Sequence, residues 1–440
     1  MFVKLGKKHL YEATSLIQEL ITDPQIDIGL SGEEIEEIIF LAKAGKPGYD
    51  GKARELIQLI MKKYGLSVAG MGDEEAANEI YKYLWGLDVA EGLYRLPYVD
   101  ELRVNGPDKV YYQDRGKNTR AVFRFKDDEH IRKIITRMIE HDRASLDESN
   151  PGCESRRLDG ARLTALCYPV TKGPCFVLRK HGTFDISEGN YLKSGTMSEY
   201  IMFLLSVLVE GRANILICGD ANVGKTTLLR FLFRYLHPLL RVVTIETDRE
   251  LLIEEWYPDR DVISIEAHPE LGWDMKRCFV ITLRLSPDVI IVGEARGLGE
   301  AGQMINAVRS GHHGSMGTIH VFSVYEAVSA LAEMALEEGR RLPVELLENQ
   351  VASAFDVIVQ MYGNSVTGVK RIEHIAEVWK GKNGPEFRDL CRWVPSDEAY
   401  EKGLWKYPFG VSERLAAKLF KFGVSKTKLA ALERMRESAA

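Results

Sequence analysis

The chain has 440 residues, of which 45% are hydrophobic and 28% are charged, and its formal net charge is −6. This length is enough for two or three domains that each bury a core of their own. The negative net charge argues against a protein whose direct ligand is nucleic acid bound by bulk electrostatic attraction. The six cysteines form no C-x-x-C pair, so the sequence predicts neither a zinc site nor a disulfide framework.

Targeting and membrane segments are the next features to consider. The N-terminus lacks an apolar stretch as long as those of signal peptides. The longest apolar run spans residues 201–209, far short of the roughly 20 residues that a membrane helix needs. The sequence therefore predicts a cytoplasmic chain with no membrane span of its own, which would reach a membrane only through a partner.

The first half of the chain divides into three predicted segments. Residues 1–75 show helical spacing of apolar residues and predict a helical segment. Residues 76–186 predict a small α/β domain. Its expected parts are a hairpin turn at 105–108, a helix at 128–141 and short strands around 159–160 and at 176–179. Residues 187–196 are interpreted as a linker.

The second half predicts one large domain and a tail. Residues 197–384 alternate apolar strands with helices, which is typical of a mostly parallel sheet covered on both faces. The expected strands are 215–218, 242–246, 289–292, 317–321 and 356–361. Residues 385–440 predict a helical segment, with helices at 412–422 and 426–437.

A phosphate-binding loop follows the first of these strands. The sequence G-x-x-x-x-G-K-T lies between an apolar strand and a helical run, which is the setting such a loop requires. Its glycines let successive N–H groups point at a phosphate. Lys225 is expected to contact the β- and γ-phosphates, and the Thr226 hydroxyl to ligate Mg²⁺. The loop predicts binding of a nucleoside triphosphate, taken as ATP, by Gly219, Asp220, Ala221, Asn222, Val223, Gly224, Lys225, Thr226 and Thr227.

Carboxylates follow two further strands. Most P-loop enzymes end the third strand in an aspartate that holds Mg²⁺, but here Gly293 stands in that place. Glu294 is therefore expected to supply the carboxylate, either to the water shell of the metal or to the attacking water. At the end of the second strand, Glu246 and Glu250 are both candidates to activate water. Asp248 and Glu250 have ordinary loop charges as their alternative interpretation.

A glycine-rich segment, residues 310–320, leads into the fourth strand. Its His312 and His320 are candidates to hydrogen-bond the γ-phosphate, because an imidazole can act as a donor. Metal ligation by these histidines would need a third ligand, which the neighbouring sequence does not offer.

Together these segments resemble the secretion-ATPase superfamily of type II and type IV secretion and type IV pili. In that family the phosphate loop is followed by an acidic Asp box, a Gly–Glu Walker B strand and a His box, and residues 292–297 and 311–320 are similar to the last two. The Asp box departs from the family pattern, with Thr247 where the aspartate belongs and Asp248 one place later. The upstream segments that are most similar to the tight-adherence (Flp) pilus assembly branch are 104–107, 147–151 and 158–162.

The resemblance implies a fold and an assembly. The fold is α/β, with a RecA-like P-loop domain preceded by a smaller α/β domain and with helical segments at both termini. The assembly is a homohexameric ring that uses ATP hydrolysis to move an integral inner-membrane platform protein, so the chain would be attached to the inner membrane through partners. The smaller domain would donate arginines to the phosphates, Arg162 and Arg179 first and Arg156 next. Family arginines expected at the subunit boundary are Arg277, Arg284 and Arg296.

Three functions are compatible with the sequence. The main prediction is an Mg²⁺-dependent ATPase motor for pilus assembly or protein secretion. The first alternative is an ATPase of conjugative type IV secretion or DNA transfer. The second is a nucleotide-gated structural subunit that does not hydrolyse ATP, which the altered Asp box would explain.

Overall fold

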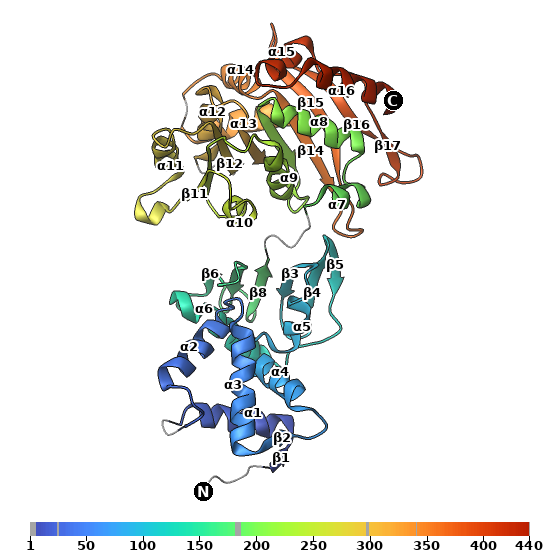
Figure 1. Cartoon of the computed structure of the whole chain (residues 1–440). Helices are drawn as coiled ribbons and strands as arrows, with labels where there is room; N and C mark the ends of the chain where they lie inside the picture. Colours follow the sequence, from blue (N-terminus) through green and yellow to red (C-terminus); the bar gives the residue numbers. More distant parts are fainter. Residues whose placement is uncertain (1–5, 24–25, 181–185, 296–298, 340, 440) are drawn as a thin grey trace. The chain divides into compact units, whose positions relative to one another are not determined.

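The computed structural model describes residues 6–23, 26–180, 186–295, 299–339 and 341–439. The chain folds into two compact units, Met1–Thr183 and Phe184–Ala440 (Figure 1). Two buried clusters of apolar side chains lie in the first unit and two in the second, so each unit has hydrophobic cores of its own.

The first unit begins with four helices packed around one apolar core. Ile17, Ile57 and Ile80 are fully buried in it, as the helical spacing of apolar residues predicts. The bounds are β1 Gly6–Lys8, α1 Leu10–Ile21, α2 Gly32–Lys43, α3 Tyr49–Tyr64, β2 Leu66–Val68 and α4 Asp73–Leu84, with β1 and β2 paired in parallel. Because α4 packs into the same core, the helical segment continues past the predicted boundary at residue 75.

A six-stranded antiparallel sheet forms the rest of this unit, in the order β5-β4-β3-β8-β7-β6. The bounds are α5 Glu91–Tyr94, β3 Val99–Val104, β4 Val110–Asp114, β5 Lys117–Arg120, α6 Asp128–Ile139, β6 Gly152–Arg156, β7 Arg162–Leu166 and β8 Cys175–Arg179. The predicted hairpin is confirmed by the pairing of Val104 with Val110, and the predicted helix by α6. Short strands do flank residues 159–160, as predicted: β6 ends before them and β7 begins after them, and the two residues form the turn between, where Gly160 has a φ of 86°.

The second unit is built on a nine-stranded sheet in the order β11-β10-β12-β13-β9-β14-β15-β16-β17. Its first six strands are parallel and the last three are antiparallel. The strands are β9 Ile215–Gly219, β10 Val242–Glu246, β11 Val262–Glu266, β12 Val289–Ala295, β13 Met316–Ile319, β14 Val357–Gly363, β15 Lys370–Lys380, β16 Pro385–Pro395 and β17 Gly403–Lys406. The helices are α7 Glu188–Lys193, α8 Glu199–Glu210, α9 Lys225–Leu232, α10 Ile253–Trp256, α11 Met275–Thr282, α12 Glu300–Arg309, α13 Glu326–Glu337, α14 Val344–Ala354, α15 Glu413–Lys421 and α16 Lys426–Ala439.

Helices cover both faces of this sheet. Successive strand residues point to opposite faces, and here both sets are apolar and buried under helices. Ile215 and Ile217 are buried in the core shared with α8, α9, α15 and α16. Leu216 and Cys218 are buried in the core shared with α12, α13 and α14 (Figure 1). The five predicted strands are all present, so the unit is a RecA-like nucleotide-binding domain preceded by a smaller α/β domain.

Two predictions at the edges of this unit are wrong. The predicted linker at 187–196 contains α7, whose Tyr191 is 2% exposed and whose ring centroid lies 4.4 Å from that of Phe231. Tyr191 therefore packs this otherwise polar segment against the core of the unit. The tail from residue 385 is not wholly helical, because β16 and β17 extend the sheet before α15 and α16 begin.

Candidate active site

The phosphate loop lies between β9 and α9, as its motif predicts. Gly224 caps the helix with a φ of 99°, and Asn222 also adopts the left-handed region at 63°. A methyl group on Gly219 would lie 2.4 Å from the carbonyl oxygen of Met361, so β14 leaves no space for a side chain there. The turn therefore requires glycine at both ends, and it places the N-terminus of α9 at the carboxyl edge of the sheet.

Lys225 is the first residue of α9, and it is 5% exposed. Its Nζ donates to the carbonyl oxygens of Gly219 and Asp220, at 3.0 and 2.7 Å, and lies 3.0 Å from Nδ1 of His320. The ammonium thus binds acceptors around the mouth of the loop. A phosphate that enters the loop must replace some of these acceptors.

His320 connects the loop to the Walker B strand. It follows β13, and its Nε2 contacts Oε1 of Glu294 on β12. A neutral imidazole protonated at Nε2 satisfies both contacts, since it donates to Glu294 and accepts from Lys225. The structure therefore brings together three of the predicted site residues, one from each of three neighbouring elements.

His312 does not join them, and its prediction as a phosphate contact in this loop is wrong. It precedes β13, whereas His320 follows it, and the strand between them spans roughly 13 Å. Its Nδ1 lies 3.0 Å from the carbonyl oxygen of Pro287, which precedes β12. His312 therefore lies at the amino edge of the parallel strands, opposite the phosphate loop.

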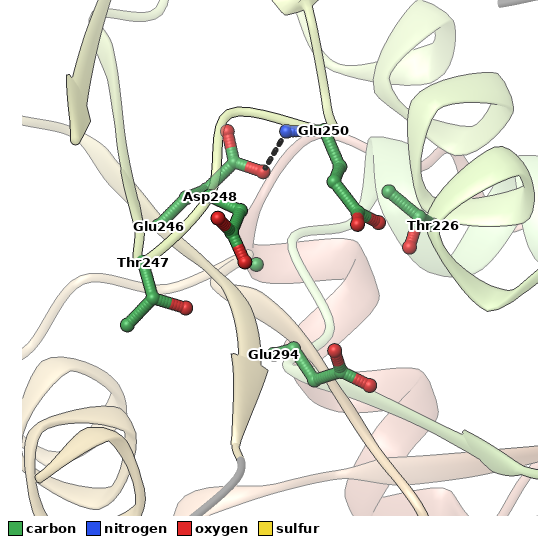
Figure 2. Close-up of a pocket in the computed structure, with 7 residues that line it drawn as sticks. Thr226, Glu246, Thr247, Asp248, Glu250 and Glu294 are labelled. Atoms are coloured by element: carbon green, nitrogen blue, oxygen red, sulfur yellow. Dashed lines mark hydrogen bonds between the residues drawn. The ribbon is translucent and has the colours of Figure 1, made fainter. Parts of the chain in front are cut away.

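A small acidic cavity opens beside Thr226. Figure 2 shows the carboxylate of Glu250 turned toward Thr226, with Glu294 across the space from it. The cavity is lined by Thr226, Glu246, Thr247, Asp248, Glu250, Gly293 and Glu294. The carboxyl ends of β10 and β12 thus meet beside the phosphate loop, where the predicted carboxylates were expected.

Glu246 is the most buried of these carboxylates, with 3% of its surface exposed. Its Oε1 accepts from the backbone N–H groups of Glu250 and Leu251, at 3.1 and 2.9 Å, whereas Oε2 is buried without a partner. Burial raises the pKa of Glu246 to about 7, because lost hydration outweighs the two N–H donors. A carboxyl that titrates near neutrality is suited to accept a proton.

Gly293 is explained by the position of Glu246. A methyl group on Gly293 would lie 2.7 Å from Cγ and 3.0 Å from Oε1 of Glu246. The space that an aspartate side chain at 293 would enter is therefore filled by a carboxylate from the neighbouring strand β10. With glycine at 293, the site lacks the carboxylate that an aspartate there would carry, and the side chain of Glu246 takes up that space.

Replacing Gly293 by alanine is expected to lower ATP turnover by about a hundredfold while ADP still binds, because the methyl displaces Glu246 and leaves Lys225 untouched. Steady-state hydrolysis and calorimetric titration with ADP measure the two effects. Gly189→Ala, which adds the same methyl to α7 where no atom lies within 4 Å, is the matched control. Unchanged turnover in the Gly293 variant would contradict a role for the position of Glu246.

Arg230 is a site residue that the motifs do not reveal. It lies on α9 and is 3% exposed. Its Nε donates to the carbonyl oxygen of Leu251 and its Nη2 to that of Glu250, both at 2.6 Å. The helix that begins at the phosphate loop thus fixes the loop that follows Glu246 and carries Glu250. No local signal marks this arginine, because its two partners are 20 and 21 residues away in the chain.

The three candidate arginines of the smaller unit form a row across its sheet. Arg156 pairs with Arg162, and Arg162 pairs with Arg179, on β6, β7 and β8. The next residues, Leu163 and Leu178, are fully buried in the core under α6, so the arginines lie on the opposite face. Arg162 also lies 3.4 Å from Glu154, between Nη2 and Oε1. The sheet thus offers three guanidinium groups on one face.

The remaining predicted arginines belong to other settings. Arg277 lies over the ring of Trp273, 4.3 Å from its centroid, and donates to the carbonyl oxygen of Gly272. Arg284 is exposed just after α11. Arg296 lies outside the described residues.

The donor set of the cavity fits a magnesium ion bound together with a nucleotide. The ion typically takes one or two protein oxygens, with phosphate oxygens and waters as its other ligands. A threonine and four carboxylate residues line the cavity. One of them, Glu246, has its Oε2 buried without a hydrogen-bond partner. Among the described residues no three His, Cys, Asp or Glu side chains could hold an ion by themselves.

Comparison with known proteins identifies the family. A family model described as type II/IV secretion system protein matches residues 91–374. The chain belongs to this family. Its members are nucleotide-binding P-loop proteins. No helix within the described ranges is long and apolar enough to cross a membrane.

Several relatives of this family member are named for conjugal transfer or type IV secretion. A protein of Mycobacterium tuberculosis named as a candidate conjugal transfer protein is 28% identical over 305 residues, which cover 67% of this chain and 84% of the relative. The conjugal transfer protein TrbB of Rhizobium radiobacter is 30% identical over 207 residues, covering 46% of this chain and 61% of the relative. The crystal structure of the VirB11 ATPase of Brucella suis with sulphate is 24% identical, with a TM-score of 0.37, covering 64% of this chain and 90% of that one.

Proposed function

We propose that this chain is an ATP-hydrolysing motor of a type IV secretion or conjugal transfer machine. The observation that carries the ATPase part is the contact series Lys225–His320–Glu294 beside the acidic cavity. It joins the phosphate loop, the His box and the Walker B strand in one site. The type of machine is proposed from the names of the relatives, which refer to conjugal transfer.

In the proposed mechanism the phosphate loop holds the β-phosphate with its N–H groups, and Lys225 turns from the loop carbonyls to the phosphates. Thr226 and Glu294 are the residues that would hold Mg²⁺, directly or through water. Bound Mg²⁺ would neutralise charge on the phosphate oxygens. His320 keeps Glu294 oriented toward the cavity.

Hydrolysis adds water to the γ-phosphorus while the bond to the β-phosphate oxygen breaks. We propose Glu246 as the acceptor of the proton that the water loses, because its carboxyl titrates near neutrality and Oε2 has no other partner. Glu250, on the same wall of the cavity, would orient the water. Arg230 supports both by fixing their loop.

The proposed assembly is a homohexameric ring. In it the arginine row of the smaller unit, Arg156, Arg162 and Arg179, would reach the phosphates of a bound nucleotide when the ring closes. A cytoplasmic position, with attachment to the inner membrane through an integral platform protein, completes the proposal. Such a partner would receive the movement that the ring produces.

Pilus assembly is a second candidate function. The observation that favours it is the set of upstream segments at 104–107, 147–151 and 158–162, which the family match includes. Genes for pilins and a platform protein beside the gene of this chain would support pilus assembly. Genes for a relaxase and a coupling protein would support conjugal transfer.

The test of the proposed ring is ATP hydrolysis by the purified chain over about a hundredfold range of protein concentration. Specific activity is expected to rise with concentration and then level off, because a site completed by a neighbour is active only in the assembled ring. Light scattering on the same samples would relate activity to mass. Equal specific activity in samples that are monomeric throughout would contradict the ring.

A further inference from the structure

The hairpin of β14 and β15 lies against the phosphate loop, on the side away from the acidic cavity. A methyl group on Gly363 would lie 2.9 Å from Cγ1 of Val223, so the end of β14 packs on the loop. Lys370 begins β15 and pairs with Gly363. A methyl group on Gly224 would lie 4.0 Å from Cδ of Lys370, so the aliphatic stem of this lysine runs beside the residue that caps α9.

Strand order determines which part of a nucleotide this hairpin would meet. The acidic residues of the cavity come from β10 and β12, and β9 separates these strands from β14 and β15. A nucleotide in the loop directs its γ-phosphate toward the carboxylates and the metal. Its α-phosphate and nucleoside then extend toward β14 and β15.

Two acids lie on this side of the loop. Asp220 faces Glu373, whose pKa is raised by burial and by that neighbour and is lowered in part by Arg371. Glu373 is fixed by Nε2 of Gln360, at 2.6 Å, and by the hydroxyl of Tyr400. These carboxylates would repel an anionic nucleotide, and Lys370 lies where it can offset the repulsion.

We propose that Lys370 binds the α-phosphate of the nucleotide held in the phosphate loop. The proposal rests on the proposed function, since it requires ATP in that loop. The rigid strand supports the lysine: the next residues, Arg371 and Ile372, are 2% and 0% exposed. A long side chain on a fixed backbone loses little freedom beyond its own rotamers when it binds.

The test separates nucleotide binding from chemistry. In Lys370→Ala the KM for ATP is expected to rise about tenfold with kcat within about twofold of the wild type, because the contact is made equally in substrate and transition state. Calorimetric titration with ADP should show the same weakening, and Lys370→Arg should restore most of it. The matched control is Lys380→Ala, at the opposite end of the same strand.

Each outcome bears on a different statement. An unchanged KM, or a fall in kcat alone, in Lys370→Ala would overturn the contact with the α-phosphate. An equal loss in Lys380→Ala would assign the effect to β15 as a whole and overturn it too. A wild-type chain that neither binds ADP nor hydrolyses ATP would overturn the proposed function itself, and this contact with it.

Discussion

Replacing Lys225 by alanine is expected to lower ATP turnover by about a thousandfold. Lys225 is 5% exposed and its ammonium lies at the mouth of the loop, where its charge would stabilise the transferring phosphoryl group. Steady-state hydrolysis of ATP measures the effect.

The fold should survive this substitution. Lys225 contacts two carbonyl oxygens and one imidazole and contributes no apolar side chain to the core. The thermal unfolding midpoint is therefore expected to stay within a few degrees of the wild type. Lys193→Ala, at the exposed end of α7, is the control for removal of a lysine from the same unit. Full turnover in Lys225→Ala would refute the proposed ATPase site.

Replacing Arg179 by alanine is expected to lower turnover by about a thousandfold or more, with ADP binding retained. A guanidinium that reaches the phosphates only in the closed ring stabilises charge that develops during transfer, and such arginines contribute about 10³–10⁵ in rate. Arg179 is at the end of the arginine row, with Arg162 on the neighbouring strand on one side and Glu101 on the neighbouring strand on the other. Arg120→Ala, on β5 at the far edge of the same sheet, is the matched control.

Mixing two inactive variants shows whether Arg179 acts on the nucleotide of its own subunit or on that of a neighbouring subunit. Lys225→Ala subunits keep the arginine row and Arg179→Ala subunits keep the phosphate loop, so a mixed ring contains complete sites only if the two parts come from different subunits. Activity that appears on mixing, and that neither variant has alone, is the expected result. Loss of activity in Arg179→Ala without rescue would show that the arginine acts within its own subunit. Full activity of Arg179→Ala alone would remove it from the site.

The alternative of a subunit that binds nucleotide without hydrolysing it rests on the altered Asp box. Thr247 does replace the expected aspartate, but Asp248 lines the same cavity one residue later. The cavity retains four carboxylates, enough for the proposed metal ligand and the proposed proton acceptor. The change in the box therefore provides no physical reason for loss of hydrolysis.

The sequence by itself determined the features that depend on neighbouring residues. The phosphate loop, the hairpin at 105–108 and the helix α6 follow from glycine torsions and from the period of apolar residues, which are set within a few positions. The alternation of strands and helices also predicted the covered parallel sheet and the edge at which the carboxylates meet.

Only the tertiary structure decided how distant residues share the site. Glu246 occupies the space beside Gly293. His312 and His320 lie at opposite ends of the parallel strands. Arg230 binds the backbone of the acidic loop. Strand β16 also escaped prediction, since its stability comes from pairing with β15. In each case the deciding quantity is a distance between residues far apart in the chain, which strand order and packing set and which local sequence does not encode.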